Sequence, residues 1–256
     1  MASAGSERLL GELTFEDVSR QLNARSVLVL PIGSIEQHGP HLPLNTDVLI
    51  AEALSQAVVR RWAPTFDLWQ LPTVSISFAR EHEWAAGTLS LSMSAMVQLI
   101  ADLGRTIRRS LPTRNLLILN GHGGNRGVLE AALRDLRADA GLNVCVFHPA
   151  ALSDGLGAIP EIHGGKNETS IMLAIAPHLV RLDRLSHEPQ EPNAVTVQER
   201  ILDLAVTWPW SSDEERLARA GVIGDPHAAA PEFGQQLIEQ AAARAGDIIR
   251  RLIENA

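Results

Sequence analysis

The segment from residue 34 to residue 47 carries two carboxylates and a histidine that could share one task. Glu36 and His38 are separated by one residue, and Asp47 follows nine residues after His38. In an extended chain, side chains at positions i and i+2 point to the same side, so Glu36 and His38 can face one point. Carboxylate and imidazole groups that converge are ligands for zinc, manganese or iron(II). Alternatively, the Glu-x-His pair occurs by chance, and Thr46 and Asp47 only cap a helix.

A second candidate ligand, His122, lies in the glycine-rich loop at residues 121–125 (Gly-His-Gly-Gly-Asn), directly after a predicted strand. The glycines would let the backbone come close to a bound group while His122 supplies a nitrogen. Such a loop is also typical of phosphate binding in dinucleotide-binding proteins. That class usually carries an acidic residue after the next strand, where this chain has His148. We therefore favour a metal site. The structural alternative is that His122 only fills a turn.

His163 and Glu168 are five positions apart, across a stretch that contains two glycines. The glycines would allow His163 to move over a bound substrate, and the near-neutral pKa of a histidine suits proton transfer. Glu168 opens a predicted helix, where the positive end of the helix dipole stabilises a carboxylate. A functional carboxylate and a helix-start acid are equally consistent with this spacing.

Other chemically active residues have a less defined role. Residues 81–84 (Glu-His-Glu-Trp) either contact the site or form a solvated loop. The segment 181–213, with Trp208 and Trp210, either shapes the pocket, of its own subunit or of a neighbouring one, or packs as a surface loop. Cys145 lies in an apolar run, which favours a buried thiol, and the chain has no G-x-S-x-G motif. The remaining histidines lack a convergent partner and are expected at the surface or at helix ends: His41, His178, His187 and His227.

The elements that must position these residues alternate between strand and helix. Apolar runs predict strands at residues 26–32, 71–76, 115–119 and 143–147. Periodic or capped segments predict helices at residues 15–22, 48–62, 90–109, 128–140, 168–176 and 231–255. The alternation predicts an α/β fold with a mainly parallel sheet covered on both faces. Ligands bind beyond the carboxyl ends of such strands, and Glu36, His38, His122, His148 and His163 all follow predicted strands.

The composition excludes several classes of protein. The chain has 256 residues, of which 45% are hydrophobic and 20% charged, so we expect one globular domain over residues 1–256. Its net charge of -8 argues against nucleic acid or an anionic membrane as a partner. A single cysteine excludes a disulfide within the chain, and the absence of tyrosine excludes a phenol as acid or base. No apolar stretch approaches the ~18 residues of a membrane span, and the N-terminus lacks the features of a signal peptide, so we expect a cytoplasmic location.

Taken in order, these motifs resemble those of the creatininase (creatinine amidohydrolase) family, over about residues 27–243. The matching pieces are residues 33–43, Asp47, Gly87-Thr88, residues 120–125, His163, residues 168–170 and residues 221–226. The resemblance implies a three-layer α/β/α sandwich and a two-metal amidohydrolase site. It also implies a homo-oligomer, often a hexamer built as a trimer of dimers.

The resemblance assigns the metal ligands residue by residue. Glu36, His38, Asp47 and His122 match ligand positions, and Asp47 would be shared by two divalent ions. We expect zinc in both positions, with manganese or iron as alternatives.

One position departs from the family pattern. Creatininases proper carry a further ligand glutamate two residues after the histidine that matches His122, and this chain has Gly124 there. We expect Glu168 to complete the second metal position instead. Gly123 replaces a bulkier side chain that creatininases use against their substrate, so creatinine is not the expected substrate. The glycine-rich loop is closer to that of two other members, a formamide hydrolase and the peptidase that trims the mycofactocin precursor.

The resulting hypothesis is a hydrolase that cleaves the C–N bond of an amide, cyclic amide or formamide in a small molecule. A hydroxide shared by the two ions would attack the carbonyl carbon, and backbone N–H groups near Gly123 and Gly124 would hold the oxyanion. His163 and Glu168 are the candidate catalytic residues, and His163 would carry a proton to the leaving nitrogen. The alternatives are a mycofactocin-type precursor peptide peptidase, a hydrolase of a C–C bond in a keto-sugar, and a metal-binding protein without hydrolase activity.

Overall fold

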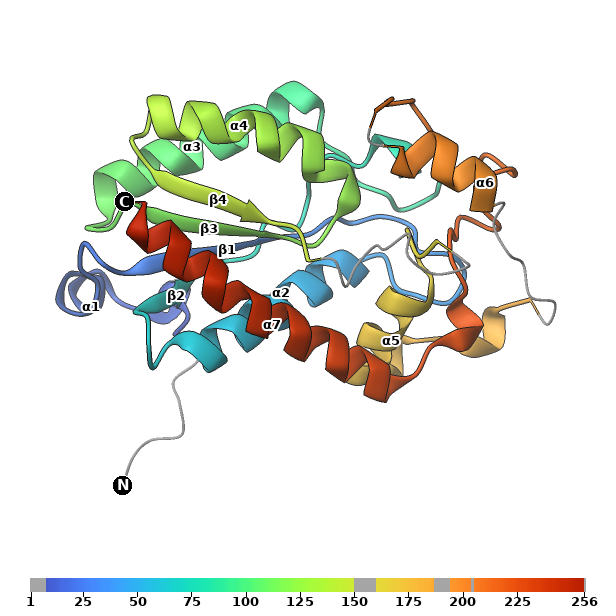
Figure 1. Cartoon of the computed structure of the whole chain (residues 1–256), viewed down its shortest axis with the longest axis horizontal. Helices are drawn as coiled ribbons and strands as arrows, with labels where there is room; N and C mark the ends of the chain where they lie inside the picture. The colour runs from blue at the N-terminus through green and yellow to red at the C-terminus, as the bar shows by residue number, and fades with distance from the viewer. Residues whose placement is uncertain (1–7, 150–159, 187–193, 204, 256) are drawn as a thin grey trace.

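The computed structural model describes residues 8–149, 160–186, 194–203 and 205–255. Within these residues the sheet has four parallel strands in the order β2-β1-β3-β4 (Figure 1). The strands are β1 (Val27–Ile32), β2 (Leu68–Gln70), β3 (Asn115–Asn120) and β4 (Asn143–Phe147). β1 pairs with β3 along its whole length, from Val27 opposite Asn115 to Ile32 opposite Asn120. The carboxyl ends of these two central strands therefore lie side by side.

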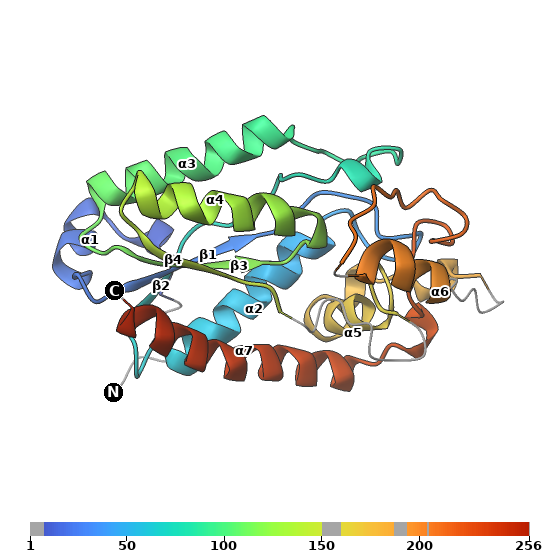
Figure 2. The same cartoon turned by 45° about the horizontal axis from the view of Figure 1, so that its top comes forward.

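Helices cover both faces of the sheet (Figures 1 and 2). One layer contains α3 (Met93–Ser110) and α4 (Arg126–Ala138). The other contains α2 (Thr46–Trp62), α5 (Lys166–Ile175) and α7 (Pro231–Glu254). The shorter α1 (Phe15–Gln21) lies at the β2 side, and α6 (Ala194–Val197), which continues as a π-helical turn over Gln198–Leu202, lies beyond the carboxyl ends of the strands. No helix in the described ranges has the length and apolar character that a membrane crossing requires.

Each face of the sheet has its own apolar core, because successive side chains of a strand point to opposite faces. Val27 and Val29 of β1 enter the core beneath α2 and α7. Leu28 and Leu30 enter the core beneath α3 and α4. All of β1 and β3 is buried, as the continuous apolar runs of their sequences predict. The predicted three-layer α/β/α sandwich with a mainly parallel sheet is confirmed.

The predicted strand at residues 71–76 is wrong, since β2 ends at Gln70. Leu71 N donates to Val29 O, but the next bond along β1, to Pro31 O, comes from Val74 N instead of Thr73 N. Between these two hydrogen bonds the second segment advances by three residues while β1 advances by two. Pro72, which lies between them, has no amide hydrogen to donate. Regular pairing stops there, and Val74 makes an isolated bridge to Ile32.

α1 begins with a side-chain cap, whereas α2 begins without one. Thr14 forms the predicted capping box with Asp17 at the start of α1. At α2 the residue before the helix is Asn45, whose side chain makes no capping bond, and Thr46 already lies within the helix. Thr46 and Asp47 are therefore not the N-cap, and the Asp47 side chain is free to serve the site.

A substitution at the contact between α5 and α7 tests how tightly α5, the helix that carries Glu168, is packed. A Cβ at Gly234 of α7 would overlap the carbonyl oxygen of Ser170 in α5. The substitution Gly234→Ala should therefore separate the helices and lower the free energy of unfolding by about 1–3 kcal/mol. The control is Gly127→Ala in α4, where no described atom lies within 4 Å of the new Cβ. That change should be neutral or stabilise by up to about 1 kcal/mol. Urea unfolding measures both, and equal stability of the two variants would contradict this packing.

Candidate metal centre

The connection between β1 and α2 brings the first three candidate ligands together. Glu36 N donates to Leu44 O at 2.9 Å, which folds the connection back on itself. Glu36 and His38 are 0% exposed and Asp47, in the first turn of α2, is 1% exposed. His38 Nε2 lies 3.0 Å from Asp47 Oδ1. The two carboxylates and the imidazole thus converge, as the spacing predicted.

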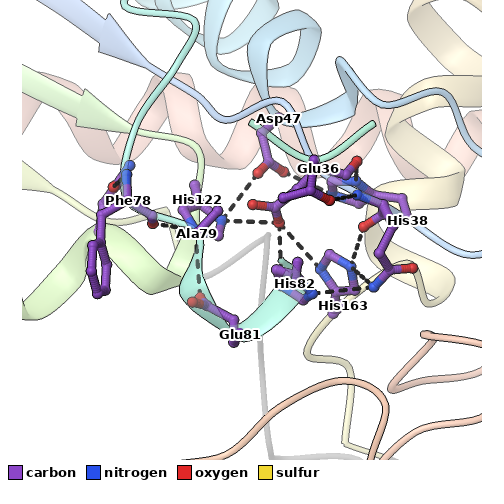
Figure 3. Close-up of polar contacts among 12 residues, drawn as sticks. Glu36, His38, Asp47, Phe78, Ala79, Glu81, His82, His122 and His163 are labelled. Atoms are coloured by element: carbon purple, nitrogen blue, oxygen red, sulfur yellow. Dashed lines mark hydrogen bonds and ion pairs between the residues drawn. The ribbon is translucent and has the colours of Figure 1, made fainter. Parts of the chain in front are cut away.

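His122 enters the same cluster from the end of β3. Its Nδ1 lies 3.1 Å from Glu36 Oε1 and 3.1 Å from Asp47 Oδ2 (Figure 3). Its Nε2 lies 3.0 Å from the carbonyl oxygen of Phe78. A carbonyl oxygen can only accept, so Nε2 carries the hydrogen, and in a neutral ring Nδ1 directs its lone pair at the two carboxylates.

His38 is oriented in a similar way by its own loop. Its Nδ1 lies 3.1 Å from the carbonyl oxygen of Glu36, so Nδ1–H donates to that oxygen. In a neutral ring, Nε2 then directs its lone pair at Asp47 and at Glu168, whose Oε2 is 3.8 Å away. Backbone carbonyls therefore fix which nitrogen of His38 and of His122 faces the cluster, as is usual for metal-binding histidines.

Glu168 and His163 complete the cluster from the segment around the start of α5. Glu168 Oε2 accepts a hydrogen bond from Gly164 N at 2.6 Å. His163 is 5% exposed, and its ring lies 4.3 Å from that of His38 and 4.0 Å from that of His82. The backbone N–H of His163 donates to Ile223 O, and the backbone N–H of Ile223 donates to His163 O. The ring is thus held inside the site between the rings of His38 and His82.

These residues fit a divalent cation. Both oxygens of Glu36 and Oδ2 of Asp47 are buried and have no hydrogen-bond partner among the described residues. Leaving buried carboxylates without compensating charge costs several kcal/mol. In the described ranges three sets of residues place one ligand atom each within 4.8 Å of the others: Glu36-His38-Asp47, His38-His163-Glu168 and Glu36-His82-His163.

The pKa values show that the cluster attracts positive charge. Burial lowers the pKa of His38, but the carboxylates of Asp47, Glu168 and Glu36, with Asp47 the largest contributor, together raise the pKa to about 10. His122 shows the same balance, and Glu36 is the main group that raises its pKa well above the ordinary value. Burial would raise the pKa of Asp47, yet His38 and His122 hold it below its usual range. Burial raises the pKa of Glu36, and it raises that of Glu168 to about 8.

Residues 81 and 82 belong to the site, whereas the sequence left residues 81–84 open. His82 is 1% exposed, and its Nε2 lies 3.4 Å from Glu36 Oε1. Glu81 Oε1 lies 3.5 Å from His122 Nε2 (Figure 3). Both residues come from a short helical turn, Arg80–His82, that lies before α3 and not at the end of a strand. The expectation that site residues follow the ends of strands therefore did not include Glu81 and His82.

Gly124 leaves the space that Glu81 uses. A Cβ at position 124 would overlap Glu81 Oε1 and lie 2.5 Å from His122 Nε2. A glutamate at this position, which the family resemblance leads us to expect, therefore cannot be added without displacing the Glu81 carboxylate.

The other candidates lie outside the cluster. The predicted surface location of His41 is wrong, because its ring is 1% exposed and its Nε2 lies 2.8 Å from Thr169 Oγ1. His178 and His227 are exposed, as predicted, and His187 lies outside the described residues. His148 points away from the cluster, with its Nδ1 3.1 Å from Asn120 Nδ2 and its Nε2 3.6 Å from Glu130 Oε1. Burial raises the pKa of the Cys145 thiol to about 11, which leaves little thiolate.

Comparisons with known proteins agree with this fold. The family model of creatininase, described as creatinine amidohydrolase, matches residues 11–249. The mycofactocin precursor peptide peptidase of Mycobacterium ulcerans is 33% identical over 240 residues, which cover 91% of this chain and 88% of that protein. The creatinine amidohydrolase of Pseudomonas putida is 29% identical over 269 residues, which cover 94% and 95% of the two chains. A solved structure described as Creatininase Mn has a TM-score of 0.76 at 28% identity and covers 96% of this chain and 98% of that one.

The fold and these relatives define an amidohydrolase enzyme of the α/β/α class. The chain belongs to the creatininase family.

The role of Gly124 gives a prediction for metal affinity. Gly124→Ala should push the Glu81 carboxylate and the His122 ring apart and weaken binding of Mn²⁺ by about tenfold or more, as is typical when the support of a ligand is disturbed. Gly123→Ala is the matched control, because no described atom lies within 4 Å of its new Cβ, and it should stay within about twofold of the parent protein. Competition against a chromophoric chelator measures both affinities. Equal affinities would show that the space at Gly124 does not matter for His122.

Proposed function

We propose that this protein is a metal-dependent hydrolase that cleaves a non-peptide C–N bond, in an amide, cyclic amide or formamide of a small molecule. One observation carries the proposal. The two oxygens of Asp47 face different histidine nitrogens, Oδ1 towards His38 Nε2 at 3.0 Å and Oδ2 towards His122 Nδ1 at 3.1 Å. A carboxylate that has a histidine nitrogen beside each of its oxygens is suited to be shared by two cations.

The surrounding groups divide into two ligand sets. Glu36 and His122 lie on the Oδ2 side of Asp47, and His38 and Glu168 lie on the Oδ1 side. We propose two divalent ions, zinc or manganese, one for each set. When bound, such ions polarise a carbonyl group and lower the pKa of water towards ~7.

His163 is the candidate for proton transfer. Its Nε2 lies 2.7 Å from the carbonyl oxygen of Gln37, so Nε2–H donates there and Nδ1 is left as an acceptor that faces the cluster, 3.7 Å from Glu36 Oε1. Burial, followed by the charge of His38, holds the pKa of His163 well below its ordinary value. A neutral imidazole with a free Nδ1 can take a proton from water and deliver it to a leaving nitrogen.

A second candidate function is cleavage of a precursor peptide. The relative from Mycobacterium ulcerans, at 33% identity, carries the name mycofactocin precursor peptide peptidase. Space is also open beside the Cβ position of Gly123, within the described residues. Both observations favour a substrate larger than creatinine.

A substrate screen tests the proposal and separates the two candidates. The protein should be loaded with Zn²⁺ or Mn²⁺, checked by elemental analysis, and incubated with cyclic amides, formamides and short peptides. We expect about two ions per chain and release of an amine or of formate from a small amide. Turnover of peptides alone would select the second candidate. Full loading without turnover of any of these compounds would contradict both.

Two substitutions should separate metal binding from proton transfer. His163→Ala should keep its metal content, while kcat should fall by about 10² to 10⁴, the usual contribution of a general acid or base. Asp47→Ala should lose both ions together, because each depends on one oxygen of the same carboxylate. Elemental analysis and initial rates measure both effects. Unchanged turnover in His163→Ala would remove this residue from the chemistry, and one full equivalent of metal in Asp47→Ala would exclude a shared ligand.

A further inference from the structure

The segment that follows α6 reaches the candidate metal centre through Ser212. In Figure 2 this segment lies beside the chain that precedes α3, and Ser212 N donates to Glu81 O at 3.0 Å. Ser212 is 1% exposed. The ring of Trp210 meets that of His82 edge-on, with centroids 6.0 Å apart. This segment therefore forms one wall of the site.

Two groups that can only donate point at the hydroxyl oxygen of Ser212. Trp84 Nε1 donates to Ser212 Oγ at 2.8 Å, and Gln37 Nε2 lies 3.1 Å from it. The orientation of the Gln37 amide is defined, because its Oε1 accepts from Gly39 N at 2.8 Å and its Nε2 also donates to Gly221 O at 3.0 Å. Gln37 Nε2 also lies 3.0 Å from His163 Nε2, which itself donates to Gln37 O and so cannot accept. One amide hydrogen of Gln37 goes to Gly221 O. The other goes either to Ser212 Oγ, where it and Trp84 Nε1 fill both lone pairs, or to His82 Nδ1.

The count of donors fixes the polarity of His82. Its Nδ1 lies 2.7 Å from Ser212 Oγ and 3.1 Å from Gln37 Nε2. A hydrogen on Nδ1 would either be a third donor at Ser212 Oγ, which can accept only two, or meet the amide N–H of Gln37 directed at Nδ1 itself. Nδ1 is therefore the acceptor. The Ser212 O–H, whose oxygen also lies 3.3 Å from Glu81 O, donates to Nδ1 at the shorter distance of 2.7 Å. The hydrogen of the neutral ring is then on Nε2, the nitrogen that faces Glu36 Oε1 at 3.4 Å.

We propose that Ser212 is a positioning residue for the metal centre: it sets His82 so that an N–H, and not a lone pair, faces Glu36. At 3.4 Å this N–H supports the Glu36 carboxylate electrostatically, whereas a lone pair would repel it. The same arrangement holds the ring on which His163 stacks at 4.0 Å. The inference rests on the proposed role of Glu36 as a metal ligand, and it gives the segment around Trp208 and Trp210 a role that its sequence does not reveal.

The neighbouring serine provides a matched control. Ser211 Oγ donates to the same carbonyl, Glu81 O, at 3.2 Å, but among the described residues it makes no hydrogen bond to His82. Ser212→Ala should weaken Mn²⁺ binding to the full-length protein by about tenfold or more, and Ser211→Ala should stay within about twofold of the parent. Competition with a chromophoric chelator gives both affinities. Equal affinities of Ser212→Ala and Ser211→Ala would overturn the inference.

A second pair of variants tests the polarity of His82 even where Ser212→Ala fails to fold. His82→Gln keeps an N–H donor at the position of Nε2, whereas His82→Asn keeps one only at the position of Nδ1. Mn²⁺ affinity should be closer to that of the parent protein in His82→Gln. Equal affinity of the two variants, or the reverse order, would overturn the inference.

Glu36→Gln separates failure of this inference from failure of the proposed function. Loss of Mn²⁺ binding in Glu36→Gln, together with parent-like binding in Ser212→Ala and both His82 variants, would reject the positioning role alone. Parent-like binding in Glu36→Gln would reject Glu36 as a ligand, and the positioning role with it.

Discussion

The arrangement around Asp47 is the constraint on which the rest of the structure depends. One buried carboxylate lies between two imidazole nitrogens, and each imidazole is held by a backbone carbonyl at its other nitrogen. Because these carbonyls can only accept, the lone pairs of His38 and His122 are directed inwards at carboxylate oxygens whenever the rings are neutral, as metal ligands are. Protein groups alone do not balance this cluster, since Glu36 is buried beside it without a hydrogen-bond partner among the described residues. A cation on each side of Asp47 would supply the missing charge.

The fold supplies this arrangement by bringing the start of α2 against the ends of β1 and β3. A Cβ at Gly33 would lie 2.5 Å from Val48 N, and one at Gly121 would lie 2.8 Å from Asp47 O. Only glycine allows the two strand ends to approach the helix so closely. The parallel pairing of β1 with β3 then sets His122 beside Glu36, although they are far apart in the sequence. The geometry of the site is therefore a consequence of sheet register and of two glycine contacts.

Sequence patterns predicted the parts of this structure that arise from periodicity. The burial of β1 and β3, the location of β4 and the amphipathic helices followed from apolar spacing. The rule about strand ends placed Glu36, His38 and His122 at one edge. The predicted strand at residues 71–76 was wrong because the pairing with β1 is interrupted at Pro72, and an apolar composition does not reveal such an interruption. Ser212 was not predictable either, since its contact with His82 spans 130 positions and depends on loops without a periodic pattern.

Anomalous diffraction from crystals grown with Mn²⁺ would test the central claim most directly, because it locates each ion independently of activity. The account predicts two anomalous peaks on opposite sides of the Asp47 carboxylate, one next to Glu36 and His122 and the other next to His38 and Glu168. A single peak that does not contact Asp47, or no peak within the cluster, would contradict it.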